Sequence, residues 1–351
     1  MKQVGLLGLP GAGKSTLFEI LLQGAGVAAP AGARDRDAVG VVRVPDDRID
    51  RLSALYRPKK TTYAQVQFVD SGAAGRVSGR PGKGPDLFAG VRNCDMLVAV
   101  VRDFENPAVP APGGVDPARD LRALQAELIL NDLAIVETRM ERIEKELRIG
   151  RRQGEREHAV LGRLRAALES ERALRGEAFD AEDEKLLRGF QLLSRKPLLV
   201  VYNQDERAAH APADAGPGTL AVALKAHVER EIVALPPEER AAFRAELGVG
   251  EDGLSLVIRA CYELLGLISF FTVGPDEVRA WTLRRGERAV DAAGEIHSDL
   301  ARGFIRAEVI GWQALLECGG HARARDRALL RLEGRDYVVQ DGDCLEIRFN
   351  K

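Results

Sequence analysis

A short glycine-rich stretch carries the clearest chemical signal in this sequence. Residues 5–16 read GLLGLPGAGKST and contain the pattern G-x-x-x-x-G-K-[ST]. This pattern is typical of a P-loop, in which backbone N–H groups turn toward phosphate oxygens at the start of a helix. In such a loop Lys14 reaches the β- and γ-phosphates, and the Ser15 hydroxyl is a candidate Mg²⁺ ligand. The sequence therefore predicts a nucleoside triphosphate site; the alternative is a chance glycine turn before a helix.

A second oxygen ligand for the metal is expected at the end of a nearby strand. Val66 to Asp70 reads VQFVD, an apolar run that ends in a carboxylate. This position makes Asp70 the candidate Walker-B acid, with an ordinary strand-end turn as the alternative. Residues 71–85, SGAAGRVSGRPGKGP, are too rich in glycine and proline for regular structure. We expect this segment to be mobile, in a place where a loop could sense the γ-phosphate.

Three apolar runs are expected to form the sheet that positions these residues. Val4 to Leu7, Met96 to Val101 and Pro197 to Val201 each have the composition of a buried parallel strand. The third run continues into YNQDE, which would place Asn203 at the edge where open α/β sheets bind ligands. Asn203 could address a purine edge and Glu206 could accept from an exocyclic amine, whereas the alternative is a polar turn.

A long charged segment between these runs has helical periodicity. Residues 116–175 place apolar side chains on one stripe with a break at Gly150 and Gly154, which predicts a helical hairpin packed as an antiparallel coiled coil. Pro117 suits the first turn of the first helix. The arginines near the predicted turn are Arg148, Arg151, Arg152, Arg156, Arg163 and Arg165. They could bind a polyanion, or they could only solvate the helix faces.

The carboxyl-terminal part alternates apolar and polar residues around glycine turns, which predicts a small mixed β-sheet domain. The Asp341-Gly342 turn between YVVQ and CLEIRF predicts a terminal hairpin. His297 opens a short helical piece, and a lone histidine there is expected to be structural, although a catalytic base is the alternative.

Composition narrows the class of protein. The chain has 351 residues, of which 51 are basic, 53 are acidic and 45% are hydrophobic. It can therefore build two or three domains, and its total charge gives no argument for a nucleic-acid or membrane partner. The four cysteines lack metal-ligand spacing, and the sequence has neither an apolar run of ~18 residues nor a charged-then-apolar leader. We expect a reduced, cytoplasmic protein with no membrane contact.

Eight segments resemble those of one family, in the same order along the chain. They are GLPGAGKSTLF, VPDDRIDRLSALYRPKK, QFVD, VVRDFENP, residues 203–206, EVRAWT, GEIHSDLARGFIRAEVI and DYVVQDGDCLEIRFN. On these motifs the chain resembles the YchF subfamily of the Obg-type (TRAFAC) P-loop NTPases. The resemblance implies an α/β fold whose P-loop nucleotide-binding domain, with a mostly parallel sheet, covers residues 1–115 and 190–264. A helical coiled-coil insertion is implied at residues 116–189, and a C-terminal ubiquitin-like (β-grasp) TGS domain at residues 265–351.

The resemblance also implies a slow NTPase that prefers ATP to GTP. The family replaces the guanine-reading Asn-Lys-x-Asp by Asn-x-x-Glu, and Asn203 and Glu206 match that form. Without the aspartate, the main discrimination against adenine is lost. Phe104 resembles a family aromatic that packs on the purine ring. The nucleotide state is implied to regulate association with ribosomes or another RNA-containing translation partner.

The resemblance assigns roles to individual residues. Lys14 is the implied catalytic residue, and Ser15 and Asp70 are the implied ligands of the Mg²⁺ cofactor. The implied nucleotide-binding residues are Pro10, Gly11, Ala12, Gly13, Lys14, Ser15, Thr16, Phe104, Asn203, Gln204 and Glu206. ATP or GTP is the expected ligand, and the chain is expected to be a monomer.

The chain departs from the family in both switch segments. Where the family carries Asp-x-Ala-Gly-Leu, residues 70–74 read DSGAA, so Ala73 replaces the glycine that usually meets the γ-phosphate. Residues 29–40, the region of the first switch, contain no threonine or serine. A slow ATP-preferring NTPase is the favoured hypothesis, and a nucleotide-binding protein that has lost hydrolysis is the second. A metabolic kinase is the third, although the helical and β-rich parts offer no obvious acceptor site.

Overall fold

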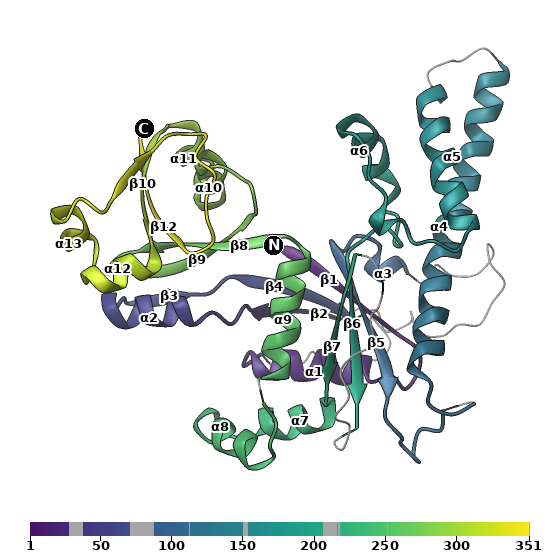
Figure 1. The fold of residues 1–351 in the computed structure, drawn as a ribbon, viewed down its shortest axis with the longest axis horizontal. Coiled ribbons are helices and arrows are strands. Elements are labelled where there is room, and N and C mark those ends of the chain that lie inside the picture. Colours follow the sequence, from purple (N-terminus) through teal and green to yellow (C-terminus); the bar gives the residue numbers. More distant parts are fainter. Residues whose placement is uncertain are drawn as a thin grey trace. The chain divides into compact units, whose positions relative to one another are not determined.

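The computed structural model describes residues 1–27, 38–70, 88–111, 113–149, 154–205, 216, 218–250 and 252–350. The chain divides into two compact units, each built around its own sheet (Figure 1). The first unit comprises Met1–Val42 and Gln67–Val257, and the second comprises Arg43–Val66 and Ile258–Lys351. The segment 43–66 thus packs in the second unit, whereas the sequence places it in the nucleotide-binding domain. The predicted domain boundaries stay a prediction.

The first sheet has the strand order β2-β4-β1-β5-β6-β7. Its strands are β1 (Lys2–Gly8), β2 (Ala38–Arg43), β4 (Gln65–Asp70), β5 (Met96–Asp103), β6 (Leu198–Gln204) and β7 (Thr219–Leu224). The pairs β1/β5, β5/β6 and β6/β7 are parallel, and β5 and β6 are buried almost throughout, as apolar runs in a covered sheet predict. Because parallel strands end at the same edge, the residues that follow β1, β5 and β6 come together there.

Helices pack around this sheet. They include α1 (Lys14–Gly24), α3 (Ala89–Arg92), α7 (Ala226–Ala234) and α8 (Pro237–Glu246), and α9 (Gly253–Leu264) leads out of the unit. Helix α1 buries Leu17, Phe18 and Leu21 on its inner face and contacts α7. Apolar residues at these helical spacings turn one stripe toward the core, and this packing fixes the start of α1 beside the end of β1.

The helical insertion is a hairpin, as its periodicity predicts. Helix α4 (Pro117–Arg148) begins after Asp116, whose carboxylate accepts from the Arg119 backbone N–H, and Pro117 takes the first helical position. The first half of α4 packs on the sheet through residues that include Leu121 and Leu128. Its second half packs on α5 (Glu155–Glu169), where Val136 and other α4 residues meet the apolar stripe of α5.

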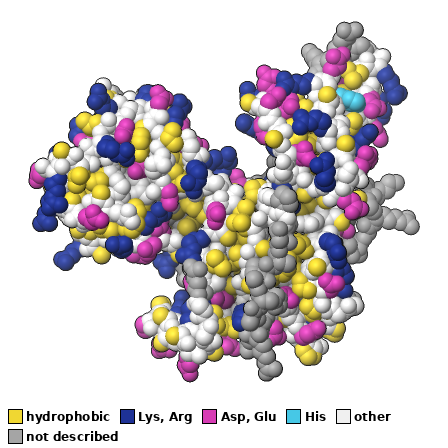
Figure 2. Space-filling view, in the orientation of Figure 1, with side chains coloured by type: hydrophobic (Ala, Val, Ile, Leu, Met, Phe, Trp, Pro, Cys, Tyr) yellow, Lys and Arg dark blue, Asp and Glu magenta, His cyan; other side chains and the backbone are white. Residues whose placement is uncertain are grey.

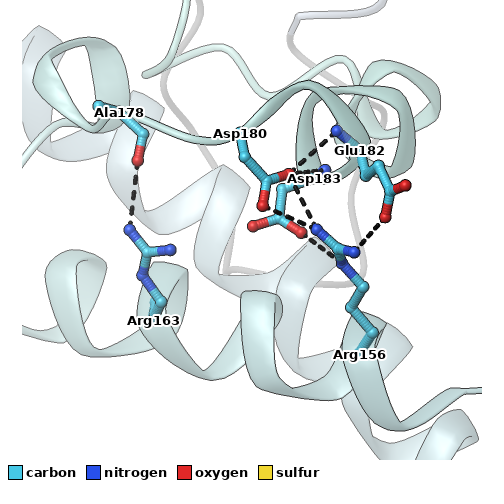
Figure 3. A network of polar contacts seen from close by, with 6 residues as sticks. All are labelled: Arg156, Arg163, Ala178, Asp180, Glu182 and Asp183. Carbon is cyan, nitrogen blue, oxygen red and sulfur yellow. Dashed lines mark hydrogen bonds and ion pairs between the residues drawn. The ribbon is translucent and has the colours of Figure 1, made fainter.

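A short helix, α6 (Ala181–Leu187), lies in the chain between the 3₁₀ turns η2 (Leu174–Gly176) and η3 (Arg188–Phe190). Charged contacts join α6 and the residue before it to α5. Figure 3 shows Arg156 of α5 pointing at Asp180, Glu182 and Asp183, while Arg163 donates to the Ala178 carbonyl at 3.2 Å. These two arginines therefore form contacts within the insertion, and polyanion binding by the arginine group stays a prediction. Figure 2 shows both signs of charge intermixed over the visible face of this hairpin.

The second unit is a sheet of order β11-β10-β12-β8-β9-β3 covered by helices on both faces. Its strands are β3 (Lys60–Thr62), β8 (Leu267–Val273), β9 (Glu277–Arg284), β10 (Phe304–Gly311), β11 (Arg331–Glu333) and β12 (Asp343–Phe349). Its helices are α2 (Asp47–Tyr56), α10 (Ala289–Ile296), α11 (Ser298–Arg302), α12 (Trp312–Cys318) and α13 (His321–Asp326). Phe270 of β8 packs in the core with α10, whereas Phe271, on the opposite face, lies under Arg48 of α2.

The expected terminal hairpin is wrong. Strand β12 pairs antiparallel with β10 and parallel with β8, and the YVVQ segment contributes only an isolated bridge between Val338 and Arg288. The Asp341-Gly342 turn is instead bound to β8, because Asp341 Oδ1 accepts from the Ser269 N–H at 2.9 Å and the Gly342 N–H donates to the Ser269 carbonyl at 2.8 Å. The turn and β12 thus bond to β8 instead of to the YVVQ segment, which the turn pattern alone suggests as the partner.

Other expectations concern single side chains. His297 is structural, since its Nδ1 accepts from the Asp299 N–H and caps α11. All four cysteines are described, and each is a buried thiol. Within the described residues, no helix is long and apolar enough to cross a membrane.

Candidate functional site

The loop between β1 and α1 has the backbone conformation that its glycines permit. Gly11 and Gly13 have φ values of +80° and +95°, in the left-handed region that favours glycine. Helix α1 starts directly after Gly13 with no acidic residue in its first turn. The positive end of its dipole therefore favours an anion at this place. The Ala12 N–H, a predicted phosphate donor, here donates to the Leu9 carbonyl at 3.1 Å.

Lys14 and Asp70 lie together, as a phosphate and metal site requires. The Lys14 ammonium is 3.0 Å from Asp70 Oδ1, and the two side chains are 11% and 4% exposed. The neighbouring Ser15 is exposed, so its hydroxyl can reach a ligand. Hydroxyl and carboxylate oxygens suit Mg²⁺, which prefers few protein ligands plus phosphate oxygens and water. No group of three His, Cys, Asp or Glu that could hold a metal alone occurs in the described part of the chain.

Asn203 connects three parts of the site. Its Nδ2 donates to the Ala12 carbonyl at 3.1 Å, and its Oδ1 accepts from the Ala226 N–H at the start of α7 at 3.2 Å. The side chain thus ties the phosphate loop to β6 and α7. Each of these atoms can make a second hydrogen bond, so the side chain could still bind a purine. Contact with a purine stays a prediction. Gln204 donates to Asp103 at 3.0 Å, and Glu206 lies outside the described residues.

A pocket of about 1000 Å³ opens beside the phosphate loop. It is lined by Gly13, Thr16, Asp103, Phe104, Glu105, Asn106, Val115, Asn203, Gln204, Asp205, Ala226, His227 and Arg230. The pocket thus brings together predicted residues from the ends of β1, β5 and β6. His227 and Arg230 on α7 were not predicted, because the sequence of a solvent-facing helix gives no sign that it borders a cavity.

Arg102 was also missed by the sequence reasoning. It lies in β5, only 4% exposed, with Nε donating to the Phe104 carbonyl at 3.0 Å and its guanidinium 4.9 Å from the centre of the Phe104 ring. The sequence held one signal for it: a charged residue at the end of an apolar run, two residues before the predicted base-binding Phe104. The two altered switch segments, residues 29–37 and 71–87, lie outside the described residues.

Comparisons with known proteins agree over the whole length of the chain. The "Ribosome-binding ATPase YchF" of Bacillus subtilis is 40% identical, covering 99% of this chain and 98% of the relative. The protein of the same name from Escherichia coli O157:H7 is 37% identical with the same coverage, and "Obg-like ATPase 1" of Oryza sativa is 34% identical over 99% of this chain and 92% of the relative.

Two further comparisons concern the C-terminal domain and the fold of the whole chain. The family model YchF-GTPase_C, described as "Protein of unknown function (DUF933)", matches residues 267–350, most of the second unit's larger segment. A solved structure titled "Structure of the Schizosaccharomyces pombe YchF GTPase" matches with a TM-score of 0.83 at 26% identity, covering 99% of this chain and 97% of that one. These matches confirm the α/β fold with its long helices and the C-terminal TGS-like domain. On its sequence and its fold, the chain belongs to the YchF family of Obg-like P-loop NTPases.

Proposed function

We propose that this protein is a slow P-loop NTPase that prefers ATP to GTP, and that its nucleotide state controls its association with ribosomes. The observation that carries the proposal is the Lys14–Asp70 pair at a glycine-rich loop beside a large pocket. The relatives' names, ribosome-binding ATPase and GTPase, support the reaction class and the partner. A ribosome partner would place the protein in the cytoplasm, where we expect it to act as a monomer.

The chain's own residues would act mainly by positioning and charge. Lys14 would exchange Asp70 for the β- and γ-phosphates, because a triphosphate offers it more negative charge than one carboxylate. Asp70, released from Lys14, and the Ser15 hydroxyl would then hold Mg²⁺. The metal held there would supply positive charge that offsets the negative charge developing on the phosphates during transfer to water. The N–H groups of the loop and of the first turn of α1 would orient the same oxygens.

Base choice would be made at the carboxyl ends of β5 and β6. Phe104 lines the pocket and would pack on the purine ring, while Asn203 would use its remaining hydrogen-bonding capacity on the purine edge. Glu206 would accept from the exocyclic amine of adenine. A guanine presents donors at N1 and N2 that an Asp would pair, and this chain has Glu at that position, which favours ATP.

Loss of hydrolysis is the second candidate, and specific residues favour it. Ala73 stands in place of a glycine, and residues 29–40 lack a hydroxyl side chain for the metal. Such a protein would bind nucleotide and partner without turnover. The two candidates share the site described above and differ only in the chemical step.

Calorimetry and single-turnover kinetics separate these possibilities. We expect tighter binding of ATP than of GTP, and a Mg²⁺-dependent difference between a non-hydrolysable ATP analogue and ADP. Single-turnover hydrolysis with purified ribosomes is expected to be faster than without them. Equal affinities for the analogue and ADP, with no turnover in either condition, would support the binding module instead. No binding of any nucleotide would defeat both.

A further inference from the structure

A buried guanidinium lies against the phosphate loop. Arg102 is the last but one residue of β5, and its side chain is directed toward the loop rather than into the pocket. Its Nη1 lies 3.3 Å from the position that a Cβ on Gly11 would occupy. The whole residue is 4% exposed, so water contributes little to solvating its charge.

In the part of the chain that the structure describes, Arg102 forms no ion pair with a carboxylate. Within the described residues, Nε bonds to a carbonyl oxygen, the guanidinium plane lies near the Phe104 ring, and the buried Nη2 has no hydrogen-bond partner. Arg244 of the same unit shows the usual arrangement, with its guanidinium bound to both carboxylate oxygens of Glu229. A buried cation without a counterion is costly to a folded protein. Arg102 is therefore an exception that requires a reason.

A bound polyphosphate would supply the missing negative charge. The Gly11 backbone is part of the loop that is proposed to surround the phosphates, so the guanidinium would be separated from them by little more than that backbone. Charge–charge attraction over such a distance remains strong where water is excluded. The unfavourable burial in the nucleotide-free protein would thus be relieved when the ligand binds.

We propose that Arg102 is a positioning residue that provides a built-in counter-charge for the polyphosphate of the nucleotide. It acts through the phosphate loop and through Phe104, which it holds at the wall of the pocket, and it does not touch the ligand. The inference rests on the proposed nucleotide-binding function. It links the phosphate end of the site to the base end through one buried side chain.

The test compares Arg102→Met with Arg102→Lys and with Arg175→Met. Methionine keeps the length and apolar stem without the charge, and lysine keeps the charge without the planar fork. Arg175 is a matched control, because among the described residues it also has a buried Nη2 without a partner. Its Nε donates to the carbonyl of Lys196, which precedes β6 and so lies at the end of that strand opposite the nucleotide site. Calorimetry with inorganic tripolyphosphate, ADP and adenosine measures binding, and thermal unfolding without ligand measures stability.

We expect Arg102→Met to weaken tripolyphosphate and ADP binding by about tenfold or more, with less effect on adenosine. Its thermal midpoint without ligand should be unchanged or higher, because an uncompensated charge is gone. Arg102→Lys should keep most of the tripolyphosphate affinity, and Arg175→Met should keep all of it.

Unchanged affinity in Arg102→Met would overturn the inference while leaving the nucleotide site intact. A lower midpoint together with equal losses for adenosine and tripolyphosphate would mean that Arg102 is only structural, and would overturn it as well. If the unmodified protein binds neither tripolyphosphate nor ATP, the proposed function fails and the inference falls with it.

Discussion

Gly13 is the position in the phosphate loop where the structure leaves least room for a side chain. Its φ is +95°, and an ideal Cβ would lie 2.3 Å from Nδ2 of Asn203. We predict that Gly13→Ala lowers both the stability of the first unit and its affinity for nucleotide. Placing a non-glycine residue in the left-handed region costs about 1–2 kcal/mol.

The displaced Asn203 adds the larger contribution. A contact this short forces the amide to move, and the amide holds both the Ala12 carbonyl and the Ala226 N–H. A buried group that loses its partner costs about 1–3 kcal/mol. With one of the two bonds lost, Gly13→Ala should destabilise the first unit by about 2–5 kcal/mol in total.

Gly26→Ala is the matched control. Gly26 follows the same helix α1 and has a φ of +74°, but nothing lies within 4 Å of its Cβ position. It should therefore show the backbone strain alone. Urea unfolding followed by far-UV circular dichroism measures the loss, and tryptophan fluorescence gives an internal reference because Trp281 and Trp312 both lie in the second unit.

A double mutant with Asn203→Ala isolates the collision. Removing the amide relieves the contact, so the two substitutions should cost less together than the sum of their separate effects. The reasoning fails if Gly13→Ala costs no more than Gly26→Ala. It also fails if the two substitutions are additive.

The remaining predictions concern the ligand and the second unit. Lys14→Ala removes the cation at the phosphates and should abolish tight nucleotide binding in calorimetry, whereas unchanged affinity would contradict the P-loop assignment. Glu206→Asp combined with Gln204→Lys should move the ATP-to-GTP affinity ratio toward GTP, and an unaltered ratio would remove Glu206 from the site. Tyr56→Phe deletes a hydroxyl 3.0 Å from both Nδ1 and the backbone N of His321, and should cost the second unit about 1–3 kcal/mol by tryptophan fluorescence in urea. Burial lowers the pKa of His321 below its ordinary value of 6.5. The unfolded chain therefore binds more protons than the folded chain, and the free energy of unfolding should fall as the pH drops below 6.5. His321→Gln should flatten this pH dependence, and an unchanged dependence would exclude His321 as its source.

Some parts of the fold follow from local pattern. The α4–α5 hairpin is predicted because its apolar stripe and its Asp116-Pro117 start act within a few residues of sequence. The phosphate loop is predicted for the same reason, since strand, glycines, lysine and helix are contiguous. The pairing of β12 could not be predicted, because the choice between YVVQ and the distant β8 and β10 depends on the packed sheet.

The sequence by itself determined which residue types this protein brings to a phosphate: the glycines, Lys14, Ser15 and a strand-ending Asp70. It also determined the family, because motifs of that family recur in order along the chain. Only the tertiary structure decided how these residues are engaged. It pairs Lys14 with Asp70, and it binds the Asn203 side chain to the backbone of the loop and of α7. It also buries Arg102 behind Gly11, with no carboxylate bound to it among the residues that the structure describes. These contacts join residues far apart in the chain, and their energies depend on burial, which no local pattern of residues specifies.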